Sequence, residues 1–217
     1  MKYKCLIIDH DDTAVNSTPT VNYPAFVSAL KKLRPQESYT LEEFMDEVIK
    51  HGFYPFMTDV LKFNEEEIEY QENVWREYAD NIMPQFFPGL CDVLRSFKAQ
   101  GGIICVLSQS SREYILQDYI ANMGIKPDKI FGCELKKELQ KPSPYAVTEI
   151  QKIYDLKKED ILLVDDLPTG LKTARAAGTD FAYAGWGMYN SELIDYMAKN
   201  ADYVFTEVYE LADVILG

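Results

Sequence analysis

The chain has 217 residues, of which 47% are hydrophobic, 13% aromatic and 26% charged, which excludes a disordered or fibrous protein. Its 35 acidic residues against 22 basic ones give a net charge of −13, so it repels nucleic-acid backbones and anionic membrane surfaces. We therefore expect neither a nucleic acid nor a membrane as its partner. The length suits one domain, or one domain with a sizeable insertion.

The cysteines and the start of the chain favour a cytoplasmic protein. No apolar run reaches the roughly 18 residues that a membrane helix needs, and the first residues turn acidic too soon for a signal peptide. The four cysteines are far apart and show no C-x-x-C spacing, which is typical of free thiols in a reducing compartment; they are Cys5, Cys91, Cys105 and Cys133.

Five short apolar runs predict strands, at residues 5–8, 103–107, 161–164, 181–184 and 203–205. They are continuous rather than alternating, as in strands that a parallel sheet buries on both faces. The stretches between them predict amphipathic helices, at residues 90–99, 112–123, 144–154 and 169–177. Gly124 and Gly178 stand where helix C-caps are expected, and Pro144 suits a first helical turn. The alternation predicts an α/β fold with a doubly wound, Rossmann-like parallel sheet.

One segment departs from this alternation. Residues 18–85 contain no run typical of a buried strand and predict helices instead, at residues 24–33, 41–51, 56–61 and 65–81. Thr40 and Asn64 are suited to be N-caps, and Glu43 completes a capping box with Thr40. We interpret the segment as a helical insertion that covers the end of the first strand.

Polar side chains follow the carboxyl ends of the predicted strands. Open α/β sheets bind their ligands beyond these ends. We expect four carboxylates, a hydroxyl cluster and one lysine to meet there; they are Asp9, Asp11 and Thr13 after the first run, the loop 108–111 after the second, Lys141, and Asp165 and Asp166.

These residue types indicate phosphoryl chemistry. Crowded carboxylates cannot all stay ionised without a cation, and oxygen ligands without histidine or cysteine favour a hard cation such as Mg²⁺. A lysine adds positive charge for a phosphoryl group, and the loop 108–111 leads into a helix N-terminus, which suits phosphate. Together the parts are typical of phosphoryl transfer.

The same residues, in the same order, resemble the motifs of the haloacid dehalogenase-like hydrolase superfamily over nearly the whole chain. The motifs are D-x-D-x-T, a serine, a lysine and an acidic pair, carried here by Asp9, Asp11 and Thr13, by Ser108, by Lys141, and by Asp165 and Asp166. The stretch 164–178 is similar to the phosphatase and sugar-phosphomutase branch, which includes β-phosphoglucomutase. The resemblance implies a core domain of residues 1–17 and 86–217 and a helical cap domain of residues 18–85.

The resemblance also implies the roles of the catalytic residues. Asp9 would be the nucleophile that forms an aspartyl-phosphate, and Asp11 would be the general acid and then the general base. Mg²⁺ would be held by Asp9, the backbone carbonyl of Asp11, and Asp166, with Asp165 either in support or as a further ligand. The implied reaction is the Mg²⁺-dependent hydrolysis of a small phosphorylated metabolite.

Further residues complete the implied site. Ser108, Gln109 and Lys141 would bind phosphate, and Thr13 would steady the turn after the first strand. The adjacent Ser110 and Ser111 are interpreted as helix caps.

Three residues depart from the family pattern. Asp12 replaces a usual glycine and tolerates left-handed geometry, and Leu167 replaces a serine after the acidic pair. His10 lies between the two catalytic aspartates, and we interpret it as a solvated or hydrogen-bonded structural residue.

Three alternatives to the phosphatase stay open. A phosphomutase of the sugar-phosphate type would use the same core motifs. A non-catalytic protein that binds a phosphorylated ligand is favoured only by Asp12 and Leu167. A dehalogenase is opposed by Asp11, because a leaving halide needs no proton. The sequence does not name the substrate or the oligomeric state.

Overall fold

The computed structural model describes residues 1–187 and 190–217. The chain forms two compact units, one made of Met1–Asn16 and Gln85–Gly217 and the other of Ser17–Pro84. Among the described residues, no helix has both the length and the apolar character needed to cross a membrane.

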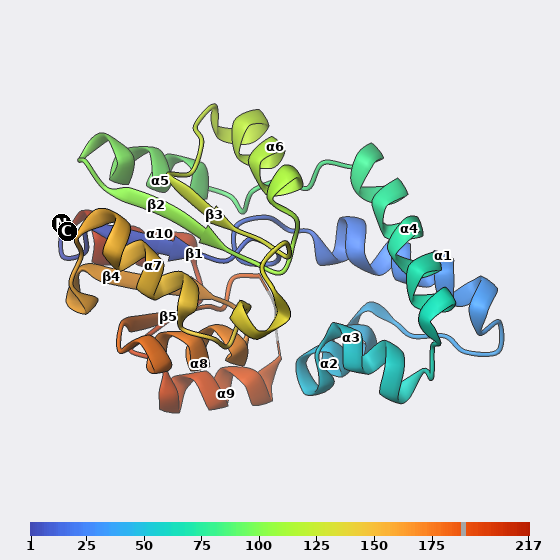
Figure 1. Cartoon of the computed structure of the whole chain (residues 1–217). Coiled ribbons are helices and arrows are strands. Elements are labelled where there is room, and N and C mark those ends of the chain that lie inside the picture. The colour runs from blue at the N-terminus through green and yellow to red at the C-terminus, as the bar shows by residue number, and fades with distance from the viewer. Residues whose placement is uncertain (188–189) are drawn as a thin grey trace. The chain divides into compact units, whose positions relative to one another are not determined.

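The first unit is built around a six-stranded sheet in the order β3-β2-β1-β4-β5-β6, and every neighbouring pair is parallel (Figure 1). Because β1 lies between β2 and β4, the strand order reverses beside it, and this is where open α/β sheets form their ligand crevice. The strands are β1 (Cys5–Ile8), β2 (Ile103–Leu107), β3 (Lys129–Phe131), β4 (Ile161–Asp165), β5 (Asp180–Ala184) and β6 (Tyr203–Phe205).

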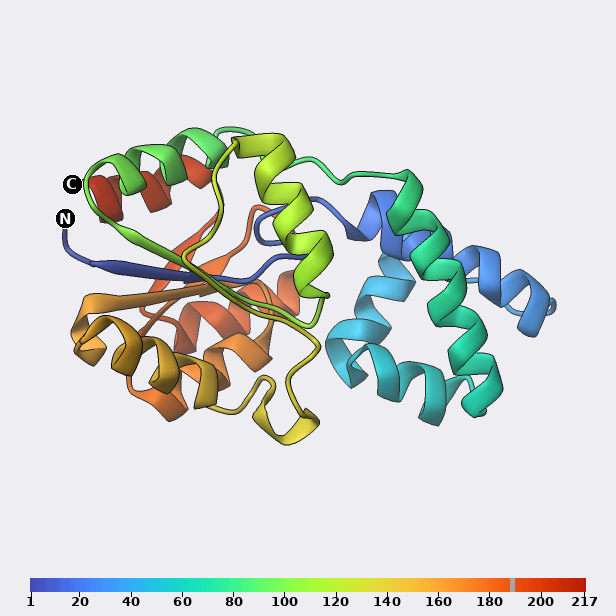
Figure 2. The same ribbon diagram turned by 45° about the horizontal axis from the view of Figure 1, so that its top comes forward.

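Helices cover both faces of this sheet (Figure 2). Side chains of α5 (Leu90–Ala99), α6 (Arg112–Met123) and α10 (Val208–Leu216) share one core with Leu6 and Ile8 of β1. The other face is covered by α7 (Tyr145–Tyr154), α8 (Pro168–Ala177) and α9 (Ser191–Asn200). Successive strand residues point to opposite faces, so two helical layers need strands that are apolar throughout. The predicted doubly wound α/β fold is confirmed.

The differences from the predicted elements are local. β3, α9 and α10 lacked a clear signal in the sequence, and β3 has only three residues. Pro144 is the N-cap of α7 rather than a residue of its first turn, because the helix begins at Tyr145. Gly124 and Gly178 end their helices with left-handed φ angles of 69° and 75°, as predicted.

The second unit is entirely helical. Its elements are the π-helical turn η1 (Thr18–Asn22), α1 (Tyr23–Leu33), α2 (Leu41–His51), α3 (Phe53–Pro55), the π-helical turn η2 (Phe56–Val60) and α4 (Glu65–Asn81). Phe26, Phe44 and Phe56 form its aromatic core, with ring centroids 4.7–6.3 Å apart. The helix predicted at residues 56–61 is instead a π-helical turn that continues from α3.

In this unit α2 and α4 each have a capping box at the N-terminus. Thr40 accepts a bond from the backbone of Glu43, as predicted, and Asn64 does the same for Glu67. Glu67 also forms a bidentate pair with Arg34 beyond the end of α1, with N–O distances of 2.6 and 3.0 Å. One carboxylate therefore caps α4 and ties it to the end of α1.

We predict that Glu67→Gln destabilises the helical unit at pH 7, and that the effect fades in acid. The hydrogen bonds from Arg34 and from the backbone of Asn64 lower the pKa of Glu67 to about 2. A carboxylate with a lowered folded-state pKa stabilises the fold above its unfolded value of roughly 4.3 and loses that contribution as the pH falls through the folded value. Urea unfolding at pH 7, 5 and 3 measures the free energy of unfolding, and the difference in this free energy between variant and wild type should shrink as the pH falls.

The neighbouring Glu66→Gln removes the same charge from the same helical turn at an exposed position and serves as the control. An equal loss in both variants would contradict a specific role for the Arg34 pair.

Candidate active site

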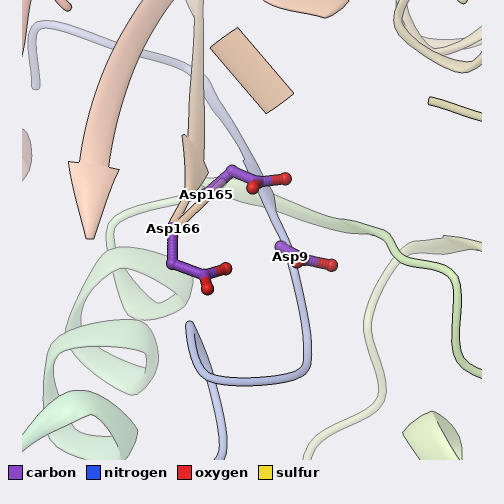
Figure 3. A group of neighbouring side chains, drawn as sticks. All are labelled: Asp9, Asp165 and Asp166. Atoms are coloured by element: carbon purple, nitrogen blue, oxygen red, sulfur yellow. The ribbon is translucent and has the colours of Figure 1, made fainter. Parts of the chain in front are cut away.

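Three buried aspartates meet at the carboxyl ends of β1 and β4, where the strand order reverses (Figure 3). Asp9 follows β1 directly, Asp165 is the last residue of β4, and Asp166 comes next. Each offers a carboxylate oxygen, and these oxygens lie within 4.8 Å of one another. The parallel pairing of β1 with β4 therefore brings together residues that are more than 150 positions apart in the chain.

Lys141 is the counter-ion of two of these aspartates. Its Nζ lies 2.6 Å from Oδ2 of Asp165 and 3.1 Å from Oδ2 of Asp9, and the lysine is only 8% exposed. Burial opposes a charge on Lys141, but the carboxylates of Asp165 and Asp9 outweigh it and raise the pKa of the ammonium group. The lysine therefore stays charged and holds Oδ2 of Asp9 in place.

Asp165 is a supporting residue by its contacts. Its Oδ2 pairs with Lys141, and its Oδ1 accepts a bond of 2.8 Å from the backbone nitrogen of Leu167. Gly170 lies against the same carboxylate, since a Cβ placed there would come within 2.3 Å of Asp165 Cγ. Both oxygens of Asp165 are thus already engaged, which fits the support that the motif implied.

Asp166 is linked to the turn after β1. The hydroxyl of Thr13 donates a bond of 3.0 Å to its Oδ1, and the indole nitrogen of Trp186 donates a bond of 3.0 Å to the carbonyl of Thr13. Gly187, the residue directly after Trp186, allows close backbone contact, because a Cβ there would lie 1.8 Å from the carbonyl oxygen of Asp12. Thr13 thus steadies the turn through its hydroxyl.

The site carries more negative than positive charge. Burial and the nearby carboxylates of Asp165 and Asp11 raise the pKa of Asp9 to about 7, against the lowering effect of Lys141. Burial and the charges of Asp165, Asp9 and Asp12 likewise raise the pKa of Asp166 well above its ordinary value. One lysine does not balance this group, so a bound cation would relieve the repulsion.

An unpaired carboxylate oxygen also indicates a cation site. Oδ1 of Asp9 is buried and has no hydrogen-bond partner among the described residues. An unpaired buried carboxylate oxygen is costly, and it is the kind of donor that a hard divalent cation prefers. The group of Asp9, Asp165 and Asp166 could therefore hold a metal ion, with Asp9 and Asp166 as its ligands and Asp165 in support.

Asp11 lies apart from this group of three carboxylates. Its Oδ2 accepts a hydrogen bond from the hydroxyl of Ser110, which lies in the loop between β2 and α6. The prediction that Ser110 and Ser111 both cap the helix is wrong for Ser110. Ser111 alone is the N-cap, accepting a bond from the backbone of Tyr114, whereas Ser110 stands one residue further out and faces Asp11.

The two residues predicted to bind phosphate on the β2–α6 loop differ in exposure. Ser108 is 4% exposed, and its hydroxyl accepts a bond of 3.1 Å from the backbone nitrogen of Ser110. Gln109 is exposed. Because β2 is the neighbour of β1, both residues lie at the same edge of the sheet as Asp9.

His10 is a buried structural residue. Its Nε2 lies 3.0 Å from Oδ2 of Asp118 on α6, and its ring stacks on Tyr119 at a centroid distance of 6.1 Å. Burial opposes protonation, but the bond to Asp118 and the charges of Asp11, Asp118 and Asp9 raise the pKa of the imidazole. The sequence did not single out Asp118, because an aspartate within a helix ordinarily faces solvent.

Comparisons with known proteins fit this geometry. A family model described as haloacid dehalogenase-like hydrolase matches residues 3–178. The chain belongs to the haloacid dehalogenase-like hydrolases. The resemblance seen in the sequence is thereby confirmed, and the protein is an enzyme of the hydrolase class.

Similar proteins match all or nearly all of this hydrolase's chain. A candidate pyrophosphatase, PpaX, of Caldanaerobacter subterraneus is 24% identical over all of this chain and 96% of its own. A structure described as a predicted phosphoglycolate phosphatase, from Haemophilus somnus, has a TM-score of 0.82 at 21% identity and covers 99% of this chain and 98% of its own. CbbY of Rhodobacter sphaeroides in complex with phosphate has a TM-score of 0.76 at 18% identity, with 96% of each chain covered. At these identities the solved structures show the shared fold.

We predict that Asp166→Asn has opposite effects on this hydrolase with and without a divalent cation. Without the cation, ionised Asp166 destabilises the fold at neutral pH because its folded-state pKa is raised, so the variant should unfold at a higher temperature than wild type. With Mg²⁺ at about 100 times its dissociation constant, the free energy of unfolding of wild type should rise by roughly 2.7 kcal/mol, and that of the variant by much less.

Thermal unfolding with Mg²⁺ and with chelator measures both effects. Asp213→Asn, which removes an exposed charge on α10, is the matched control and should behave as wild type. An equal gain from Mg²⁺ in wild type and in Asp166→Asn would contradict a metal site at this cluster.

Proposed function

We propose that this hydrolase is a Mg²⁺-dependent phosphatase that hydrolyses a small phosphate monoester through an aspartyl-phosphate on Asp9. The observation that carries the proposal is the set of contacts that the Asp9 carboxylate makes. Lys141 holds its Oδ2 at 3.1 Å, while its Oδ1 is buried and unpartnered among the described residues. A fixed carboxylate with one free oxygen beside a buried ammonium group suits an attacking nucleophile.

The names of similar proteins agree with this reaction class. PpaX is named as a candidate pyrophosphatase, and the Haemophilus protein as a predicted phosphoglycolate phosphatase. CbbY has been solved with phosphate and, as a variant, with xylulose-1,5-bisphosphate. All of these names concern phosphate compounds, which supports a small phosphorylated metabolite as the substrate.

The first chemical step joins Asp9 to the phosphoryl group. Oδ1 of Asp9 attacks phosphorus, the bond from phosphorus to the leaving oxygen breaks, and Asp11 gives its proton to that oxygen. Lys141 balances negative charge on the phosphoryl oxygens, and Ser108 and Gln109 bind those oxygens beside the N-terminus of α6. The presence of Asp11 favours a phosphate ester over a haloacid, because an alkoxide leaving group needs the proton and a halide does not.

The second step releases phosphate. Asp11, now ionised, removes a proton from a water molecule, whose oxygen attacks phosphorus while the bond to Asp9 breaks. Asp9 returns to its carboxylate form and Asp11 to its acid form, so the cycle closes without any other reactant.

The cation fits the residues that would hold it. The carboxylate of Asp166, the backbone carbonyl of Asp11 and the Asp9 oxygen that does not attack phosphorus are the proposed ligands, and Asp165 supports them through Lys141. When bound, Mg²⁺ would neutralise negative charge on the phosphoryl group and on the aspartates.

Residues 18–85 are proposed to act as a cap that excludes water from the reaction and admits the substrate. The compact helical unit that is inserted between β1 and β2 supports this role. We also propose a cytoplasmic location, because the four cysteines are free, as they would be in a reducing compartment.

We predict that Asp9→Asn lowers phosphate release by at least about a thousandfold, since it removes the nucleophile. Phosphate release from a panel of sugar phosphates, phosphoglycolate and pyrophosphate, with Mg²⁺ and with chelator, is the measurement. Chelation should abolish release from wild type, and Asp213→Asn should keep full activity.

The panel also separates the alternatives. Isomerised sugar phosphate without free phosphate would identify a mutase. Mg²⁺-dependent binding of a phosphate compound without turnover of any member would identify a binding protein, and either result would overturn the phosphatase.

A further inference from the structure

Two adjacent serines before α6 have different contacts. The hydroxyl of Ser110 donates to Oδ2 of Asp11, whereas the hydroxyl of Ser111 accepts from the backbone nitrogen of Tyr114 and caps the helix. Ser110 therefore contacts Asp11, the proposed acid and base, directly, whereas the hydroxyl of Ser111 caps the helix.

The backbone that carries the Ser110 hydroxyl is held on both sides. Its nitrogen donates a bond of 3.1 Å to the hydroxyl of Ser108, and its carbonyl accepts a bond of 3.0 Å from the nitrogen of Cys133. Gly132 packs against the same carbonyl, since a Cβ there would lie 2.7 Å from the oxygen. The donor is thus fixed before any substrate arrives, which is what a positioning group requires.

The backbone of Asp11 is anchored to the same part of the fold. His10, the preceding residue, binds Asp118 on α6, and its carbonyl accepts bonds of 2.8 and 3.0 Å from the nitrogens of Ala14 and Val15. The loop is therefore restrained next to Asp11, so that the remaining freedom lies in the Asp11 side chain, which is only half-buried. The hydrogen bond from Ser110 removes that freedom.

We propose that Ser110 is a positioning residue that orients Asp11 for proton transfer, an inference that rests on the proposed phosphatase function. With Oδ2 bound to Ser110, the other oxygen of Asp11 carries the proton that passes to the leaving oxygen and later receives one from water. Ser110 keeps its own proton throughout. Without it, the carboxylate rotates freely and spends less time in the orientation that proton transfer needs.

The leaving group provides the test. An aliphatic phosphate ester needs a proton on its leaving oxygen, whereas 4-nitrophenyl phosphate releases a stabilised phenolate that needs none. The ratio kcat/KM reports the steps up to the transfer of the phosphoryl group to Asp9, and so isolates the acid role of Asp11.

The experiment compares Ser110→Ala with Ser111→Ala on 4-nitrophenyl phosphate and on the aliphatic ester from the panel that wild type hydrolyses fastest. General acid catalysis is worth about 10²–10⁴-fold, so we expect a partial loss of about tenfold in kcat/KM for the aliphatic ester with Ser110→Ala. For 4-nitrophenyl phosphate the same variant should stay within about twofold of wild type. Ser111→Ala should leave the ratio between the two substrates unchanged.

Two further variants guard against a change in folding. Ser110→Thr keeps the hydroxyl and should restore the selectivity of wild type. Ser110→Cys keeps the shape but has only a weak donor, and should resemble Ser110→Ala. Thermal unfolding midpoints of all variants establish that the proteins compared are folded.

Each outcome bears on the proposal. An equal loss on both substrates, or the same selectivity change in Ser111→Ala, would show a merely structural role and overturn it. Full activity of Ser110→Ala on the aliphatic ester would overturn it while the phosphatase function stands. A wild-type protein that releases phosphate from neither substrate would overturn the proposed function, and this inference with it.

Discussion

Three buried carboxylates share one buried ammonium group at the centre of this hydrolase, and the arrangement of the site depends on that imbalance. Lys141 compensates Asp165 and holds one oxygen of Asp9, but Oδ1 of Asp9 stays without a partner among the described residues. Burial makes the remaining charge expensive and raises the pKa of Asp9 and Asp166. Such a site is suited to a cation, which would neutralise part of this negative charge.

The backbone around this cluster is shaped to bring the charges together. The parallel pairing of β1 with β4 places Asp9 beside Asp165, and the absence of a side chain at Gly170 leaves room for the Asp165 carboxylate. Thr13 and Trp186 then tie the turn after β1 to Asp166. Packing and hydrogen bonds therefore sustain a concentration of like charge that would not form by itself.

Two different segments hold the two halves of the site. The β4 segment and Lys141 surround the proposed nucleophile and metal ligands. The loop before α6 holds Asp11 through Ser110, and α6 itself holds the adjacent His10 side chain through Asp118. The nucleophile and the proposed acid are two residues apart in the chain, yet each has its own supporting contacts. This separation allows each of the two aspartates the task that is proposed for it.

The sequence by itself determined most of the elements, though not α9 and α10, together with the parallel sheet and the motif residues, because continuous apolar runs, helix caps and turn residues are local signals. β3 was missed since three residues carry too little periodicity, and residues 56–61 were misjudged because a π-helical turn shares the apolar pattern of an ordinary helix. Only the tertiary structure decided the partners of the buried charges. That His10 would pair with Asp118, or that Ser110 rather than Ser111 would face Asp11, depends on how α6 packs against the loop after β1, and contacts across about 100 residues leave no local pattern to read.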